Sequence, residues 1–344
     1  LRGVVVSTAG ILLLVLAIIE GPQWGWASAG TLACFAGAAG LLTAFTVLEL
    51  RTEGPLLDVR VFKIPRFTGG AVSISVAFFC LFGFIFLITQ YFQFVKGYST
   101  LSAGLHTLPF AIVAAVATPI AAVVALRVGT RLVVGLGLLL MGSGLVVAAF
   151  NSSAGTTYWG PIVLAMVLLA LGLSSITAPT AEAVMGSVSD EQRGAAAGVN
   201  NTTRELGGTL GVAVFGSIFA SSYAPKIISA FRPLPIPAGP KAEAHQSMAA
   251  ALAVVGHAPR AARPALESIA FNAFHSGLQV ACLAGAGVAL FGALAAFKLL
   301  PGRGAPEVAL AGESSTETAT ETATESVTFA DLDRYPEYVP YVSA

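Results

Sequence analysis

Long stretches without a charged side chain dominate this sequence. No Asp, Glu, Lys or Arg occurs in seven intervals, which are residues 3–19, 21–48, 67–95, 97–126, 132–181, 206–225 and 268–297. Six of them can each hold one helix that crosses a bilayer, since about 20 residues span roughly 30 Å of hydrocarbon. The interval 132–181 is 50 residues long and contains the polar patch 151–157, so it predicts two crossings. The pattern indicates that lipid surrounds most of the chain.

The predicted fold is an all-α polytopic membrane protein with eight transmembrane helices. Helices and closed barrels satisfy backbone polar groups in lipid, and these apolar runs are too long and continuous for barrel strands of about ten residues. The predicted helices are residues 3–20, 29–48, 69–92, 104–126, 132–150, 159–179, 196–221 and 274–298.

The distribution of basic residues predicts which side of the membrane the ends face. Eight crossings place both ends on one side. Ten Lys and Arg residues fall on that side, whereas the short loops opposite contain Lys96 alone. Basic residues concentrate in cytoplasmic loops, so we expect a multi-pass cell-membrane protein with both termini in the cytoplasm. Residues 1–29 also resemble a cleaved signal peptide. Counting them as a crossing instead keeps the loops rich in basic residues on one side of the membrane.

The chain divides into four predicted segments. These are two transmembrane helices (1–50), a cytoplasmic loop (51–68), a six-helix part (69–298) with a long outer loop (222–273), and a cytoplasmic tail (299–344). The tail is predicted to be acidic and disordered, because Glu recurs at every fourth position of its Thr-rich repeat and like charges would stack on a helix.

The long outer loop is predicted to begin without helical structure. Its prolines are Pro225, Pro233, Pro235, Pro237 and Pro240. Proline interrupts a helix interior, so this part should be irregular, and the Ala-rich stretches 241–255 and 262–272 suit short surface helices.

Several classes of function have no residues to support them. The formal net charge is zero and Lys and Arg form no run, which argues against a nucleic-acid binder. No zincin, nucleophile-elbow, P-loop, EF-hand or selectivity-filter motif occurs, so we expect no enzyme, no metal site and no cofactor. Cys34, Cys80 and Cys282 lie in apolar stretches and suit small buried side chains.

Polar groups within the spans are therefore the candidates for a transport pathway, because burying them in lipid is costly. The richest segment is 200–211, with Asn200, Asn201, Arg204 and Glu205. Arg204 can pair with Glu205, face the interior of the bundle, or extend along the helix to the cytoplasmic interface. Gly207, Gly208 and Gly211 follow in a G-x-x-x-G context that favours close packing of two helices over ligand binding.

A second candidate set lies near the end of the third span. Helical spacing places five side chains on one face, which are Phe79, Phe82, Phe86, Gln90 and Gln93. This face grades from aromatic to amide, which suits an amphipathic organic ligand; a lipid-facing row of phenylalanines is the alternative.

Other features are expected to shape the helices and their ends. Pro109, Pro119, Pro161 and Pro179 are predicted to kink or break helices. His106 and His275 lie near the outer ends of spans with no acidic residue close in sequence, so we expect both to be interfacial.

Five motifs in order along the first 300 residues resemble the C-terminal portion of the fourteen-spanner drug:proton antiporters of the major facilitator superfamily. They are Glu20-Gly21-Pro22-Gln23-Trp24-Gly25-Trp26, Pro55-Leu56-Leu57-Asp58, Thr89-Gln90-Tyr91-Phe92-Gln93, Ala103-Gly104-Leu105 with Leu108-Pro109, and Gly198-Val199-Asn200-Asn201-Thr202-Thr203-Arg204-Glu205-Leu206-Gly207-Gly208.

The resemblance implies a division of the eight spans. The first two would be the pair inserted between the two six-helix halves, and the other six would be the second half, itself built from inverted repeats. Residues 127–131 would occupy the family's D-R-x-G-x-R loop, but Leu126 replaces its acidic residue. The first half, with its proton-coupling acid, has no counterpart in this sequence.

The predicted function is proton-coupled efflux of drugs, antibiotics or other amphipathic organic compounds by alternating access. The proton would be the coupling ion, and the partners would be small organic substrates, the lipid bilayer and the missing N-terminal half of the same transporter. A permease for one metabolite, and an inactive truncated or scaffold membrane protein, are the alternatives.

Overall fold

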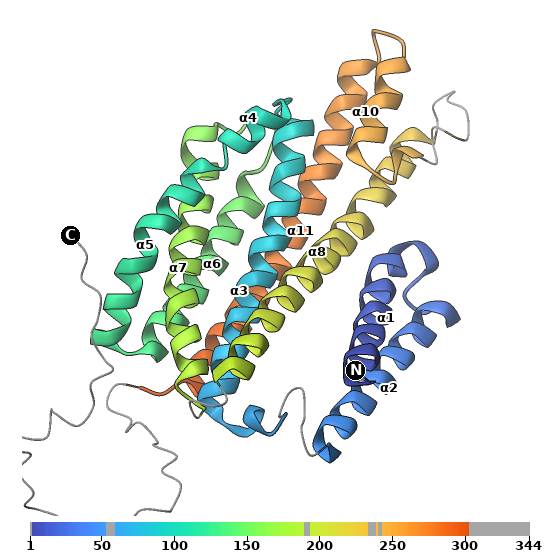
Figure 1. Ribbon diagram of the computed structural model, residues 1–344. Coiled ribbons are helices and arrows are strands. Elements are labelled where there is room, and N and C mark those ends of the chain that lie inside the picture. The colour runs from blue at the N-terminus through green and yellow to red at the C-terminus, as the bar shows by residue number, and fades with distance from the viewer. Residues whose placement is uncertain (1, 53–58, 189–192, 233–238, 240–242, 303–344) are drawn as a thin grey trace, which may run out of the picture. The chain divides into compact units, whose positions relative to one another are not determined.

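The computed structural model describes residues 2–52, 59–188, 193–232, 239 and 243–302, a part of the chain that consists of helices and short connections (Figure 1). Eight of its helical segments are long and apolar enough to cross a membrane. They run from Gly3–Trp24, Ala29–Arg51, Pro65–Val95, Thr100–Val128, Thr130–Asn151, Tyr158–Met185, Ala196–Phe231 and Arg263–Leu299. Each overlaps one predicted span, so the all-α membrane fold and its eight crossings are confirmed.

The helices have the following bounds. They are α1 (Arg2–Trp24), α2 (Ala29–Arg51), the 3-10 helix η1 (Val59–Lys63), α3 (Pro65–Gln90), the π-helical turn η2 (Tyr91–Val95), α4 (Thr100–Leu105), α5 (Leu108–Val128), α6 (Thr130–Asn151), the π-helical turn η3 (Tyr158–Ile162), α7 (Val163–Met185), α8 (Arg193–Phe231), α10 (Met248–His257) and α11 (Arg263–Leu299).

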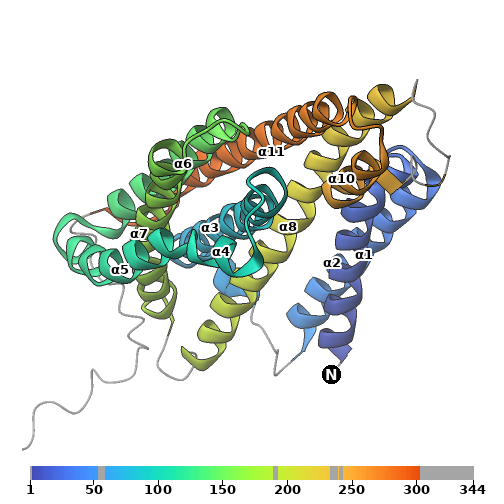
Figure 2. The same cartoon turned by 90° about the horizontal axis from the view of Figure 1, so that it is seen from above.

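Helix α3 is central among the six long helices α3, α5, α6, α7, α8 and α11. This helix contacts α7, α8 and α11, while α6 packs against α7 and α11, and α5 packs against α7 (Figures 1 and 2). The first two helices form a hairpin of their own, and α1 also contacts α8. Helix α8 therefore has α3 on one side and α1 on another.

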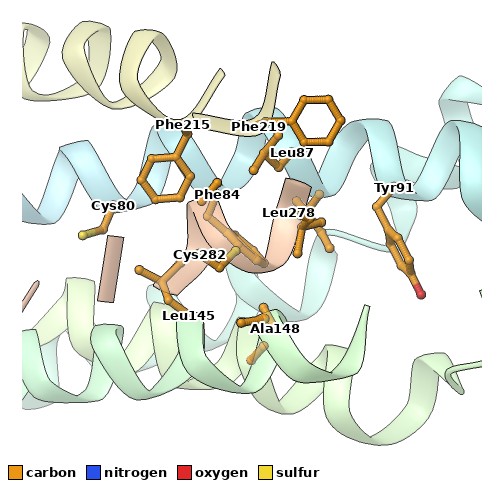
Figure 3. Packing of buried hydrophobic residues seen from close by; sticks show 14 of the residues in the cluster. Cys80, Phe84, Leu87, Tyr91, Leu145, Ala148, Phe215, Phe219, Leu278 and Cys282 are labelled. Carbon is orange, nitrogen blue, oxygen red and sulfur yellow. The ribbon is translucent and has the colours of Figure 1, made fainter. Parts of the chain in front are cut away.

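The core lies where α3, α6, α8 and α11 meet. Figure 3 shows its buried side chains, which include Cys80, Phe84, Leu87, Leu145, Phe215, Phe219, Leu278 and Cys282. The thiol of Cys80 donates to the carbonyl oxygen of Gly285 at 3.5 Å, so it links α3 to α11. Small residues let membrane helices pack closely. Cys80 and Cys282 are buried as predicted, whereas Cys34, for which burial was also predicted, is half-buried.

The prediction that Pro225 excludes a helix is wrong. Helix α8 continues through Pro225 to Phe231. A proline inside a helix costs about 3 kcal/mol, but the turns around it bury Tyr223, Ile227 and Phe231, and the hydroxyl of Tyr223 lies 3.4 Å from the carbonyl oxygens of Ala244 and Ser247. Packing against the following segment thus maintains the helix. Pro233, Pro235, Pro237 and Pro240 lie outside the described residues.

The second part of the outer loop differs from its prediction in one stretch. A short helix, α10, does occur in the first Ala-rich stretch. Residues 262–272 are not a separate surface helix, because α11 begins at Arg263, with Pro264 in its first turn, and buries Leu266 and Ala270. Proline is well suited to that position, where its missing N–H has no partner in any case. The predicted tail lies outside the described residues beyond Gly302.

Two of the four prolines expected to disturb spans do so. Pro109 begins α5 after the turn that follows α4, and Pro161 lies in η3 next to the non-helical Trp159 and Gly160. Pro119 and Pro179 lie inside α5 and α7, which continue past them. Neighbouring helices therefore accommodate the lost backbone hydrogen bonds.

Gly129 joins α5 to α6 in a conformation that other residues rarely adopt. Its φ is +101° and its ψ is 144°. We expect Gly129→Ala to destabilise the protein by about 1–3 kcal/mol, the usual cost of holding a side chain in such a backbone region. Thermal stability of the purified complete protein in detergent would measure it. Gly40→Ala is the control, because a methyl group at this helical site meets nothing within 4 Å; an equal loss in both variants would contradict the prediction.

Candidate functional site

Helices α3 and α8 touch at backbone distance near the start of α8. A methyl group at Gly207 would lie 2.3 Å from the carbonyl oxygen of Ser75, and one at Gly211 would lie 2.2 Å from that of Phe79. Both distances are far below van der Waals contact, so these positions accept glycine alone without a backbone shift. The two glycines are four residues apart, as are their two partners on α3, so the helices run side by side over this turn.

The aromatic side chains of α3 extend this contact toward the end of the helix. The ring of Phe79 is half-buried and lies 5.7 Å from that of Phe215, edge to face. Phe82 lies over Gly208, with its ring 3.2 Å from a methyl group placed there, and Phe86 lies over Gly216 at 3.4 Å. Phe82 and Phe86 remain 40% and 37% exposed. The predicted face is therefore divided: Phe79 enters the helix contact, and the other two rings form its open edge.

Gln90 and Gln93, the amide side chains of the predicted face, do not lie on one continuous α-helix. Gln90 is half-buried and its side-chain nitrogen donates to the carbonyl oxygen of Phe86 at 3.3 Å. The α-helix ends there, since Tyr91–Val95 is a π-helical turn. Gln93 is half-buried within that turn. Sequence spacing at 3.6 residues per turn does not describe such a turn, and π-helical turns are frequent at functional sites.

Arg204 extends into the aromatic part of α3. Its guanidinium carbon lies 4.4 Å from the centre of the Phe78 ring, within cation–π distance. Phe78 is thirteen residues from the first residue of α3 and twelve from the last, or about 18–20 Å from either end. The charge therefore lies at the middle of α3, whereas extension to the cytoplasmic interface predicts a position near a helix end.

In the part of the chain that the structure describes, Glu205 forms no ion pair with Arg204. Arg204 is half-buried against α3, while Glu205 is exposed. Consecutive residues on a helix point about 100° apart, so the two side chains of this pair leave the helix in different directions. Arg204 therefore contacts the aromatic ring of Phe78 instead of forming the ion pair with Glu205 that the sequence allowed.

Asn200 and Asn201 occupy contrasting surroundings one turn before Arg204. Asn200 is 7% exposed, and its side-chain oxygen has no hydrogen-bond partner within the described ranges. Asn201 is exposed. A buried polar oxygen without a partner costs about 1–3 kcal/mol, so Asn200 has an unused acceptor beside the α3–α8 contact.

A second face of α8 borders a cavity of about 660 Å³ that the sequence did not reveal. Its walls come from α1 (Val4, Ser7, Ile11, Leu14, Val15), α2 (Leu42, Phe45), η1 (Phe62) and α8 (Gly198, Val199, Thr202, Thr203, Leu206, Thr209, Leu210). The spacing of these α8 residues could have indicated a second contact face. Their partners on α1 are nearly 200 residues away in the chain and could not be assigned from spacing.

Comparison with known proteins decides the family. The profile described as Major Facilitator Superfamily matches residues 1–212, more than half of the chain. The chain belongs to the Major Facilitator Superfamily. The match covers both helices of the α1–α2 hairpin and the Arg204 segment.

Several curated proteins are similar to this chain in sequence. The multidrug resistance protein Stp of Mycobacterium tuberculosis is 30% identical over 221 residues, which is 64% of this chain and 41% of the relative. The tetracenomycin C resistance and export protein of Streptomyces glaucescens is 29% identical over 316 residues, 89% of this chain and 58% of the relative. The multidrug efflux pump LfrA of Mycolicibacterium smegmatis is 30% identical over 282 residues, 80% and 53% respectively. The chain thus spans about half the length of these relatives.

A solved structure supports the same fold. A bacterial homologue of the human lysosomal transporter Spinster, in an inward-facing and occupied conformation, aligns with a TM-score of 0.52 and 19% identity. The alignment covers 85% of this chain and 67% of the other. At this identity the likeness concerns the arrangement of helices.

The turn between α5 and α6 departs from the superfamily pattern described above. Leu126, at the position of the acidic residue, is 73% exposed at the end of α5, and Arg127 and Arg131 are exposed on either side of Gly129. An apolar side chain at this position cannot form a salt bridge.

The opposite end of the six-helix part contains a network around Lys96. The ammonium group donates to the carbonyl oxygens of Ala154, at 2.9 Å, and Thr156. The hydroxyl of Tyr91 donates to the backbone carbonyl oxygen of Ser153 at 3.0 Å. These bonds fasten the loop after α6 to the end of α3. Partial burial lowers the pKa of Lys96 below its ordinary value, because the charged form loses water.

His106 lies inside an aromatic cluster at the same end. Its ring stacks on Tyr98 at 4.2 Å and meets Tyr158 edge to face at 4.5 Å. Tyr158 also donates to the carbonyl oxygen of His106 at 2.8 Å. His275, the other histidine expected at a helix end, is half-buried on α11, and its Nδ1 has no partner in the described part of the chain.

Proposed function

We propose that this chain is the C-terminal portion of a proton-coupled exporter of amphipathic organic compounds that works by alternating access. One observation carries the proposal: the Arg204 guanidinium lies against Phe78 at the middle of α3, beside the exposed rings of Phe82 and Phe86. A charged group at membrane depth is costly and rarely serves packing alone. The names of the relatives, which describe multidrug resistance, tetracenomycin C resistance and export, and multidrug efflux, support the same conclusion.

The substrate pathway in this proposal follows the open edge of the α3–α8 contact. Phe82 and Phe86 would contact the apolar part of a ligand, with Phe79 supporting them from within the helix contact. The side chains of Gln90, Gln93, Asn200 and Asn201 would offer hydrogen bonds, and Arg204 a positive charge. Ligand sites commonly combine mostly apolar walls with a few polar groups of this kind.

The proposal includes a partner that completes the pathway. Exposed apolar side chains cover the outer face of α5, with Ile112, Val116 and Ile120 one turn apart. Since the chain spans about half the length of its relatives, we propose that the remaining half of the same transporter supplies the other wall and the proton-coupling acid. In this proposal the proton is the coupling ion and both termini are cytoplasmic. The proposal includes no cofactor and no nucleic-acid partner.

Cells that express the complete protein are expected to accumulate less of a fluorescent cationic dye such as ethidium than control cells. A protonophore should abolish the difference, because export would then lose its driving force. Fluorescence of the dye in intact cells measures both effects. Unchanged accumulation across a broad panel of amphipathic compounds would overturn the proposal, and transport of a single metabolite would identify a permease instead.

A further inference from the structure

The cavity between the α1–α2 hairpin and α8 has the length of one leaflet of a bilayer. Its walls extend from Val4 to Val15 on α1 and from Gly198 to Leu210 on α8, or about 16–18 Å at 1.5 Å per residue. The hydrocarbon core of a membrane is about 30 Å thick, so one leaflet contributes about half of that. Beyond the cavity the helices meet, since the hydroxyl of Ser217 donates to the carbonyl oxygen of Ile18.

The chemistry of the walls suits a hydrocarbon chain. The described residues that line the cavity include no charged side chain. The hydroxyl of Ser7 donates to the carbonyl oxygen of Val4 at 3.1 Å, and the hydroxyl of Thr209 donates to the backbone carbonyl oxygen of Glu205 at 2.9 Å. Both hydroxyl groups are therefore hydrogen-bonded within their own helices. A drug with an ionic group would leave that group unpaired here, which costs free energy in an apolar environment.

Basic side chains lie next to one end of this cavity. Phe62, part of the wall, belongs to η1 together with Lys63, which is exposed, and its ring contacts Phe67 at 5.3 Å. Arg51 ends α2 and is also exposed. Glu49 is 7% exposed and turns toward Gly3 of α1. Of the side chains that the structure describes next to this end, the exposed Arg51 and Lys63 are both positive, which favours an anionic headgroup.

We propose that this cavity binds one acyl chain of an anionic phospholipid, with the phosphate of the headgroup at Arg51 and Lys63. A volume of about 660 Å³ lies within the range of natural ligand sites. With the proposed orientation, the lipid comes from the cytoplasmic leaflet. The bound chain would fill the space between the hairpin and α8. The site is separate from the pathway at Arg204, so its test does not depend on transport.

The test uses the complete protein, purified in detergent and mixed with equal amounts of phosphatidylglycerol and phosphatidylethanolamine. Native mass spectrometry then counts the lipids that remain bound. The wild-type protein should retain phosphatidylglycerol preferentially, and Ser7→Trp, which fills the cavity, should reduce this to background. Leu136→Trp on α6, exposed and outside the cavity, is the matched control and should retain it. Thr202→Trp fills the cavity from α8 and replaces Ser7→Trp if that variant aggregates.

A second variant examines the headgroup. Replacing Arg51 and Lys63 together by glutamine should weaken binding of phosphatidylglycerol by roughly fivefold for each charge, while binding of phosphatidylethanolamine stays the same. Equal retention of the two lipids by the wild-type protein would overturn the proposal. So would equal retention of phosphatidylglycerol by Ser7→Trp and Leu136→Trp. If Ser7→Trp lost binding of ethidium and not of phosphatidylglycerol, the cavity would be a substrate site and the lipid proposal would be wrong.

Discussion

Gly211→Ala is expected to lower the thermal stability of the complete protein substantially. The new methyl group would lie 2.2 Å from the carbonyl oxygen of Phe79, and the nearest atoms belong to backbone, which cannot rotate away as a side chain can. Helices α3 and α8 would have to separate along the whole contact. Overpacking of a core usually costs 1–3 kcal/mol and occasionally more, so we expect about 3 kcal/mol. That corresponds to a fall of roughly 5 °C or more in the temperature of unfolding.

The control for this prediction comes from the same helix. A methyl group at Gly198 meets nothing within 4 Å, and one at Gly216 meets the ring of Phe86 at an ordinary 3.4 Å. Both alanine variants should therefore be as stable as the wild-type protein. The measurement is the fraction of monodisperse protein in size-exclusion chromatography after heating in detergent. If Gly211→Ala were as stable as Gly198→Ala, the two helices would not touch at backbone distance.

Arg204→Ala is expected to reduce dye export about tenfold or more while the amount of protein in the membrane stays the same. The guanidinium is the charged group that lies against α3 at mid-helix, and a loss of 1.4 kcal/mol of interaction corresponds to tenfold. Removing a charge from a membrane helix favours insertion by about 2.5–3.5 kcal/mol on insertion scales. A loss of export with undiminished protein would therefore reflect function and not folding. Initial rates of efflux from loaded cells, normalised to protein in the membrane, measure it.

Two further variants sharpen the result for Arg204. Phe78→Leu removes the ring and keeps the charge, so export should fall less than in Arg204→Ala, because a cation–π contact contributes about 0.5–2 kcal/mol. Lys226→Ala removes an exposed positive charge from the far part of α8 and should leave export unchanged. Export at the wild-type rate in Arg204→Ala would assign this side chain a packing role alone.

The eight crossings could be predicted because the penalty for placing a charge in lipid acts on each segment by itself. The same reasoning could not locate the ends of the helices. A helix that extends beyond the membrane into water can contain charged residues. Helix α11 therefore begins at Arg263 and includes Glu267, and α8 includes Lys226. The local cost of Pro225 does not end α8, because burial of Tyr223 and Phe231 against residues further along the chain offsets it.

The sequence alone proposes candidate site residues but does not arrange them in space. Spacing placed Phe79 and Phe82 on one face of a helix, but only the path of α8 decides that Phe79 meets Phe215 while Phe82 stays open. Likewise, the sequence left three directions for Arg204, and the position of Phe78 on another helix selects one of them. A side chain of this length has no preferred direction until a neighbouring helix provides a partner.

Hydrophobicity and charge act on each segment separately, so the sequence alone is enough to establish that this chain is a bundle of membrane helices. The tertiary structure decided which faces of those helices meet. The contact of Gly211 with α3 and the cavity between α1 and α8 both join segments far apart in the chain. Such pairings depend on the shapes of two surfaces together, and no periodicity within one helix specifies the surface of the other.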